Sequence, residues 1–201
     1  MATDIIRTFF GFDLPRAVSD RAAGLRTLVD DPKKAVRWVR GRNIHLTLRF
    51  LGATPRSAVD DIAAAMQTQL QTFPSFEIVV RGTGVFPAPT RPRALWMAVE
   101  GATDRLLELE QAIHQGVEPI GFPREERNYL PHITLGRVHY PQKITPDVTM
   151  FLNAHYEPVE CSLKALHLYE SRMGDSGLNY VRLATFNLQS APTKAMDQEK
   201  S

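Results

Sequence analysis

Cysteine is almost missing from this sequence, because Cys161 is the only one among 201 residues. A single cysteine excludes an intramolecular disulfide and a zinc site built from several cysteines, and it fits a reducing compartment. Long apolar runs are missing too, since none approaches the roughly 18 residues of a membrane-spanning helix. The N-terminus does not have the profile of a signal peptide. These absences predict a soluble, cytoplasmic protein with no membrane association.

Well-known phosphate-binding and nucleophile signatures are also absent. Gly82-Thr83-Gly84 lacks the third glycine and following helix of a dinucleotide fingerprint, and no Walker A pattern occurs. There is no Gly-x-Ser-x-Gly nucleophile elbow. What is present is a globular composition, 43% hydrophobic and 23% charged, with arginine making up 18 of the 24 basic residues. Arginine suits phosphate, but a GC-rich coding bias gives the same excess, so composition permits a phosphate-bearing substrate without requiring one.

The length predicts a single domain over residues 1–189, followed by a polar tail over 190–201 that we expect to be disordered. Hydrophobic patterning predicts strands at 8–12, 36–39, 44–51, 76–80, 94–99, 130–135, 162–169 and 180–188. It predicts helices that begin at Pro15, Pro55 (capped by Thr54), Thr103 and Pro146, and a loop over 82–92. Strands and helices alternate too irregularly for a parallel βαβ fold. We therefore expect an α+β fold with mixed or antiparallel sheets.

A His-x-Thr tetrapeptide at residues 45–48 recurs at 132–135, which is 87 positions later. In each copy an apolar residue follows the histidine and a leucine follows the threonine. Two copies that match to this extent have a chance expectation on the order of 10⁻⁴. Each copy lies on an expected strand after a strand–helix arrangement. The repeat therefore indicates an internal duplication into two similar lobes.

The two-residue period of a strand predicts the direction in which the histidine and threonine side chains point. Residues two apart face the same side, so His45 projects with Thr47, and His132 with Thr134, while their apolar neighbours face the core. If the two strands face each other across a groove, two imidazoles and two hydroxyls converge. Near neutral pH one imidazole can be neutral and the other protonated. One base and one acid suit in-line displacement at phosphorus, and the hydroxyls can donate to phosphate oxygens.

Two other interpretations also fit the repeat. Each histidine can be a core residue that is satisfied by its neighbouring threonine, although this explains a single copy better than a matched pair. A metal site is the second alternative. Two histidines lack the third protein ligand of a catalytic zinc, and neither strand supplies a carboxylate. We therefore expect no metal.

The match extends well beyond the tetrapeptides. The residues concerned are 37–39, 43–52, Phe86-Pro87, Leu95-Trp96, 131–137, 168–171, Gly177 and Tyr180. Over roughly residues 7–188 the sequence resembles the 2H phosphoesterases, and among them the RNA 2′,3′-cyclic phosphodiesterases, historically called 2′-5′ RNA ligases. The resemblance implies a two-lobed α+β fold with pseudo-twofold symmetry. In it, antiparallel or mixed sheets line a central groove and the helices lie outside.

The resemblance also implies an activity. These enzymes open RNA 2′,3′-cyclic phosphates to 2′-phosphomonoesters without a metal or nucleotide cofactor, and a 5′-hydroxyl replaces water in the reverse ligation. His132 would be the general base on water and His45 the general acid that protonates O3′. Thr47, Thr134 and Arg137 would hold the phosphate. From the residues alone the direction stays open, because the two tetrapeptides are interchangeable.

Two candidate binding residues depend on context. Arg137 lies an odd number of residues after His132, so it reaches the site only if the strand bulges near Gly136; otherwise it is a solvated arginine at a strand end. Trp38 lies in a basic stretch with Arg37 and would stack on an RNA base. The alternative is a core tryptophan beside a solvated loop.

Other functions fit the same sequence. One is a related phosphodiesterase that acts on another cyclic or 2′-5′-linked nucleotide, such as ADP-ribose 1″,2″-cyclic phosphate. Another is a protein that binds RNA ends without turnover, although two intact tetrapeptides argue against it. The expected partner is RNA or a nucleotide with a 2′,3′-cyclic phosphate end, and no feature requires more than a monomer.

Overall fold

The computed structural model describes residues 4–125, 128–139, 145–174 and 177–190. Its strands are β1 (Ile5–Asp13), β2 (Val36–Trp38), β3 (His45–Pro55), β4 (Phe76–Phe86), β5 (Ala94–Gly101), β6 (His132–Val138), β7 (Val159–Leu163), β8 (Ala165–Gly174) and β9 (Gly177–Asn187). Its α-helices are α1 (Arg16–Arg26), α2 (Val59–Gln69), α3 (Thr103–Val117) and α4 (Thr149–Leu152). Short 3₁₀ turns are η1 (Gly41–Asn43), η2 (Arg56–Ala58) and η3 (Glu118–Ile120).

The strands form two sheets, and each sheet contains one copy of the repeated tetrapeptide. The four-stranded sheet has the order β3-β1-β8-β9, and the five-stranded sheet has the order β2-β6-β5-β4-β7. All of these neighbours pair antiparallel. The expected α+β fold with antiparallel sheets is confirmed, and the two copies lie on β3 and β6, one in each sheet.

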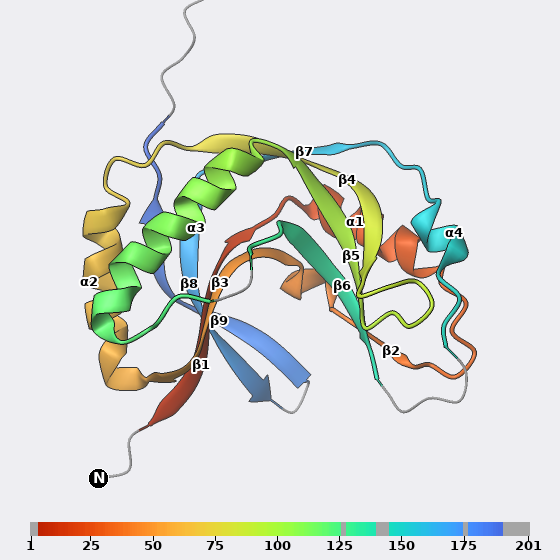
Figure 1. Cartoon of the computed structure of the whole chain (residues 1–201), viewed down its shortest axis with the longest axis horizontal. Helices are drawn as coiled ribbons and strands as arrows, with labels where there is room; N and C mark the ends of the chain where they lie inside the picture. Colours follow the sequence, from red (N-terminus) through yellow and green to blue (C-terminus); the bar gives the residue numbers. More distant parts are fainter. Residues whose placement is uncertain (1–3, 126–127, 140–144, 175–176, 191–201) are drawn as a thin grey trace, which may run out of the picture.

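The helices lie outside the sheets (Figure 1). Helices α2 and α3 pack against each other next to the four-stranded sheet, and α4 lies beside β4 of the five-stranded sheet. Helix α3 buries Leu106, Leu109 and Ile113, which recur at the three- and four-residue spacing of one helix face. This amphipathic pattern favours a helix and determines which face of that helix packs on the core.

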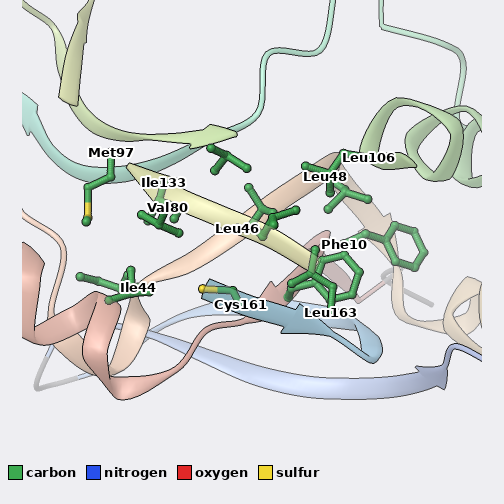
Figure 2. Close-up of a cluster of buried hydrophobic side chains, with 14 of the residues drawn as sticks. Phe10, Ile44, Leu46, Leu48, Val80, Met97, Leu106, Ile133, Cys161 and Leu163 are labelled. Atoms are coloured by element: carbon green, nitrogen blue, oxygen red, sulfur yellow. The ribbon is translucent and has the colours of Figure 1, made fainter. Parts of the chain in front are cut away.

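The core side of both tetrapeptides is apolar. Leu46 and Leu48 of β3, and Ile133 and Leu135 of β6, are buried, whereas the histidines and threonines between them are only partly buried. Figure 2 shows Leu46, Leu48 and Ile133 in one cluster with side chains from β1, β4 and β7. Burial of these leucine and isoleucine side chains holds the two strands in place and directs the histidines to the opposite faces.

The predicted boundaries of the strands at 76–80 and 162–169 were wrong. The expected loop over 82–92 begins too early, since β4 continues to Phe86. There Gly84 pairs with Trp96, and the indole lies directly over it. The expected strand over 162–169 is two strands in different sheets, β7 and β8, which meet at Lys164. The apolar alternation changes phase at this crossing, because Ala165 and Leu166 are both apolar, and the predicted single strand overlooked that break.

The expected helix start at Thr54 and Pro55 was also wrong. Both residues belong to β3, and α2 begins at Val59 after the η2 turn. The Thr54 hydroxyl is buried and lies 2.7 Å from the hydroxyl of Thr8 on the neighbouring strand. A cross-strand hydroxyl pair therefore takes the place of the expected helix cap.

Within the described ranges, no helix has the length and apolar character to cross a membrane. The tail predicted over residues 190–201 lies outside the described residues apart from Ser190.

Gly84 gives a direct test of this packing. A Cβ at Gly84 would lie 2.1 Å from Cζ2 of Trp96, whereas one at Gly24 in α1 would meet nothing within 4 Å. We expect Gly84→Ala to lower the free energy of unfolding by about 1–3 kcal/mol, because the indole must move. The control Gly24→Ala should raise it by about 0.5–1 kcal/mol. Denaturant unfolding measures both, and a Gly84→Ala protein as stable as wild type would contradict the packing described.

Candidate active site

His45 opens strand β3, and both nitrogens of its ring have partners. Nδ1 lies 2.7 Å from the backbone carbonyl oxygen of Asn43. Since a carbonyl can only accept, Nδ1 carries the proton and donates. Nε2 lies 2.8 Å from the Thr47 hydroxyl. The Asn43 side chain donates to the carbonyl of Leu178 at 2.7 Å, so the segment that holds His45 is tied to β9.

His132 opens strand β6 in the same way. Its Nδ1 donates to the backbone carbonyl of Leu130 at 2.8 Å, again two residues before the histidine. In both rings the Nδ1 hydrogen bond leaves Nε2 as the basic nitrogen of the neutral form. The two copies of the tetrapeptide therefore share the orientation of the imidazole as well as the sequence.

Aromatic rings surround both histidines. The rings of Phe9 and Tyr180 each lie 4.9 Å from the His45 ring, centroid to centroid. Phe86 lies 5.2 Å from His132 and Trp96 lies 6.2 Å from it. These rings restrict each imidazole to one orientation and exclude water from its faces, which favours the neutral form of the ring.

The pKa of His45 is lowered, chiefly because burial disfavours the charged ring. Two groups oppose this: the Asn43 carbonyl and the negative charge of Asp13. Asp13 stands directly opposite His45 in the β1–β3 register. Its carboxylate is held by the Tyr169 hydroxyl and the Arg182 guanidinium. No local motif marks Asp13 in the sequence, and only the pairing of β1 with β3 reveals its position.

The pKa of His132 is also lowered, again chiefly by burial, and the Leu130 carbonyl opposes this. Here the nearby charge is positive, because Arg137 lowers the pKa further. The two histidines therefore share a backbone arrangement but have opposite charges beside them. A carboxylate favours the protonated form of His45, and a guanidinium favours the neutral form of His132.

Arg137 reaches the face of His132 through a β-bulge. Leu95 pairs with Gly136, but the next residue, Trp96, pairs with Thr134, so Leu135 is the extra residue. After it the alternation reverses and Arg137 is exposed, while Val138 is buried. The strand does bulge next to Gly136, which is the condition under which Arg137 shares a face with His132. Strand β3 bulges at the corresponding residue, since Phe10 pairs with Arg49 and Gly11 with Thr47.

Contacts between the two sheets bring both tetrapeptides into one region. The Tyr129 hydroxyl, in the segment that leads into β6, donates to the backbone carbonyl of Thr47 at 2.9 Å. Burial raises the pKa of Tyr180, and the charge of Arg137 opposes this. Since Tyr180 packs on His45, Arg137 of one sheet lies within electrostatic reach of the surroundings of the other histidine.

A cavity of about 200 Å³ opens beside His45. Its walls include Asp13, Arg42, Asn43, Tyr180 and Arg182. No group of three or more histidine, cysteine, aspartate or glutamate side chains able to hold a metal ion occurs in the part of the chain described.

The structure does not bring Trp38 to either histidine. Trp38 pairs with Gly136 on β6, where a Cβ would lie 2.9 Å from its ring, and the Arg26 guanidinium lies 5.6 Å from the ring centroid. These contacts are those of a packing residue. The neighbouring Arg37 instead pairs with Arg137.

Comparison with known proteins agrees with this geometry. Residues 14–175 match the family model of the 2′-5′ RNA ligase superfamily. An RNA 2′,3′-cyclic phosphodiesterase from Thermotoga maritima is 32% identical over 179 residues, which are 87% of this chain and 91% of the relative.

Solved structures share this fold. The crystal structure of TT0787 from Thermus thermophilus superposes with a TM-score of 0.75 at 26% identity, and the match covers 92% of this chain and 99% of that one. The fold is shared with E. coli LigT complexed with 3′-AMP, which has a TM-score of 0.69 at 23% identity over 92% of this chain and 99% of that one. The chain belongs to the 2′-5′ RNA ligase superfamily.

Proposed function

We propose that this protein is an RNA 2′,3′-cyclic phosphodiesterase, which hydrolyses a cyclic phosphate end to a 2′-phosphomonoester. One observation carries the proposal: His45 and His132, one in each sheet, are held by identical Nδ1 hydrogen bonds that leave Nε2 for chemistry. The name of the Thermotoga maritima relative supports the same substrate class. All residues in the proposal come from one chain, so we propose a monomer as the active unit.

In this mechanism the cyclic phosphate lies between the two Nε2 atoms. Neutral His132 takes a proton from water as the water oxygen bonds to phosphorus. The bond from phosphorus to O3′ breaks, and protonated His45 gives its Nε2 proton to O3′. The phosphate stays on O2′. His132 ends protonated and His45 neutral, and proton exchange with solvent restores both.

Three groups stabilise the charge that builds on the non-bridging oxygens. The hydroxyls of Thr47 and Thr134 share the faces of their histidines, and Arg137 follows on the face of His132. A guanidinium adds a charge-assisted, bidentate contact to phosphate. By microscopic reversibility the same groups serve the reverse reaction, in which an RNA 5′-hydroxyl takes the place of water.

The charges near the two histidines support the direction of proton transfer. A general acid must be protonated at the start, and Asp13 favours that form of His45. A general base must be neutral, and Arg137 favours that form of His132. We therefore assign His45 as acid and His132 as base.

Removing either imidazole tests the assignment of catalysis. We expect His45→Ala and His132→Ala each to lower kcat/KM for an RNA with a cyclic phosphate end by about 10²–10⁴. The double variant should lose little more, because acid and base act as a unit. The exposed His155 supplies a matched control, His155→Ala. The assay contains EDTA and identifies which ribose oxygen keeps the phosphate; wild-type turnover should persist and leave a 2′-phosphate.

The outcomes of that assay separate the candidate functions. Full turnover by either single variant would overturn the catalytic pair. Turnover only of another cyclic or 2′-5′-linked nucleotide would support the related phosphodiesterase instead. Salt-sensitive RNA binding without any hydrolysis would support a binding protein.

Two charge variants test the direction of proton transfer. Asp13→Asn removes a charge that raises the pKa of His45, so the alkaline limb of the pH profile of kcat/KM should move to lower pH. Arg137→Gln removes a charge that lowers the pKa of His132, so the acidic limb should move to higher pH. Tyr169→Phe keeps the Asp13 charge but removes one hydrogen bond, and it should leave both limbs in place. Movement of the acidic limb in Asp13→Asn would assign His45 as the base.

A further inference from the structure

Two arginines from neighbouring strands stand directly opposite each other at the edge of the five-stranded sheet. Arg37 of β2 pairs with Arg137 of β6, and β2 is the outermost strand. The adjacent pair, Val36 and Val138, is buried. Since faces alternate along a strand, Arg37 projects from the same face as Arg137 and Thr134. Both arginines are exposed.

This pair of like charges is not part of an ion pair among the described residues. Like charges directly opposite on paired strands destabilise a sheet. In the part of the chain described, neither guanidinium forms an ion pair with a carboxylate. In the other sheet the exposed Arg172 pairs with Glu170 and Arg182 with Asp13, whereas the exposed Arg7 of β1 forms no ion pair within the described residues. An uncompensated arginine pair on a face that bears catalytic groups is suited to an anion.

One phosphate does not account for both arginines. Arg137 is the closer of the two to His132 in the sheet, and it has already been assigned to the reacting phosphate. Arg37 starts one strand further out, about 5 Å away, so its guanidinium can extend past the reacting group. Arg40 and Arg42, which follow β2 in the sequence, instead reach β9 of the other sheet: Arg42 donates to Asn179 at 2.8 Å, and the Arg40 guanidinium lies beside Gly177.

From this arrangement we propose that Arg37 binds the phosphodiester that joins the terminal nucleotide to the rest of the RNA. The inference rests on the proposed function, because it takes the cyclic phosphate to lie at Arg137. It adds a second phosphate subsite, which distinguishes an RNA end from a mononucleoside cyclic phosphate. The RNA strand then leaves the site over the β2 edge.

The test compares Arg37→Gln with wild type on three substrates. These are a diadenosine RNA with a 2′,3′-cyclic end, the same compound with an uncharged methylphosphonate link, and adenosine 2′,3′-cyclic phosphate. We expect Arg37→Gln to lower kcat/KM for the charged dinucleotide by about 10-fold or more, as loss of a charge-assisted hydrogen bond does. The loss should be confined to the compound with the charged link. Arg105→Gln, which removes only a surface ion pair with Glu108 on α3, is the matched control.

Salt dependence gives a second readout. The slope of log kcat/KM against log salt for the charged dinucleotide should become shallower by about 0.7 in Arg37→Gln, the value for one phosphate contact on a single strand. Arg37→Lys, which keeps a point charge, should retain that slope. Equal losses on all three substrates, or no loss on any, would overturn the proposal.

Failure of the proposed function would give a different result. If wild type hydrolyses none of the three compounds, the proposed function fails. The Arg37 subsite is then decided by equilibrium binding of the charged and methylphosphonate dinucleotides to wild type and Arg37→Gln. A preference for the charged link that disappears in the variant supports the subsite, and identical binding of both compounds contradicts it.

Discussion

Two hydrogen bonds from imidazole to backbone determine which chemistry this protein can perform. Nδ1 of His45 donates to the Asn43 carbonyl and Nδ1 of His132 to the Leu130 carbonyl. A backbone carbonyl two residues earlier cannot donate, so neither ring can place its neutral-state proton on Nε2 without losing this bond. Asn43 is tied to β9 through its side-chain hydrogen bond to the Leu178 carbonyl, and buried leucine and isoleucine side chains of β3 and β6 direct both imidazoles away from the core. The orientation of both Nε2 nitrogens therefore depends on these hydrogen bonds and on core packing.

The duplication repeats the strand, the bulge and the imidazole orientation, but it does not repeat the charges. Asp13 faces His45, and Arg137 follows His132. The residue of β3 that corresponds to Arg137 is Phe50, which is 51% exposed and packs on Phe9. Two nearly identical strands can thus take different parts in one proton transfer, since the pKa of each histidine responds to neighbours outside the repeated tetrapeptide.

The sequence predicts the parts of this site that need only local periodicity. A period of two residues is enough to place His45 with Thr47 and His132 with Thr134, and the recurrence of the tetrapeptide indicates the pairing. Features that depend on contacts between distant strands have no such signal. The position of Asp13 follows from the β1–β3 register, and that of Trp38 from its pairing with Gly136. The change of sheet at Lys164 does have a local signal, since the hydrophobic alternation shifts phase where Ala165 and Leu166 follow each other.

The two Nδ1 hydrogen bonds require that both histidines hold their neutral-state proton on Nδ1. Long-range ¹H–¹⁵N correlation spectra of the imidazoles, recorded above the pH at which each ring titrates, measure this directly. His45→Ala and His132→Ala spectra assign the signals. We expect a protonated Nδ1 and an unprotonated Nε2 in both rings. A protonated Nε2 in either neutral ring would contradict it, because that nitrogen would then have its proton where the mechanism needs a lone pair.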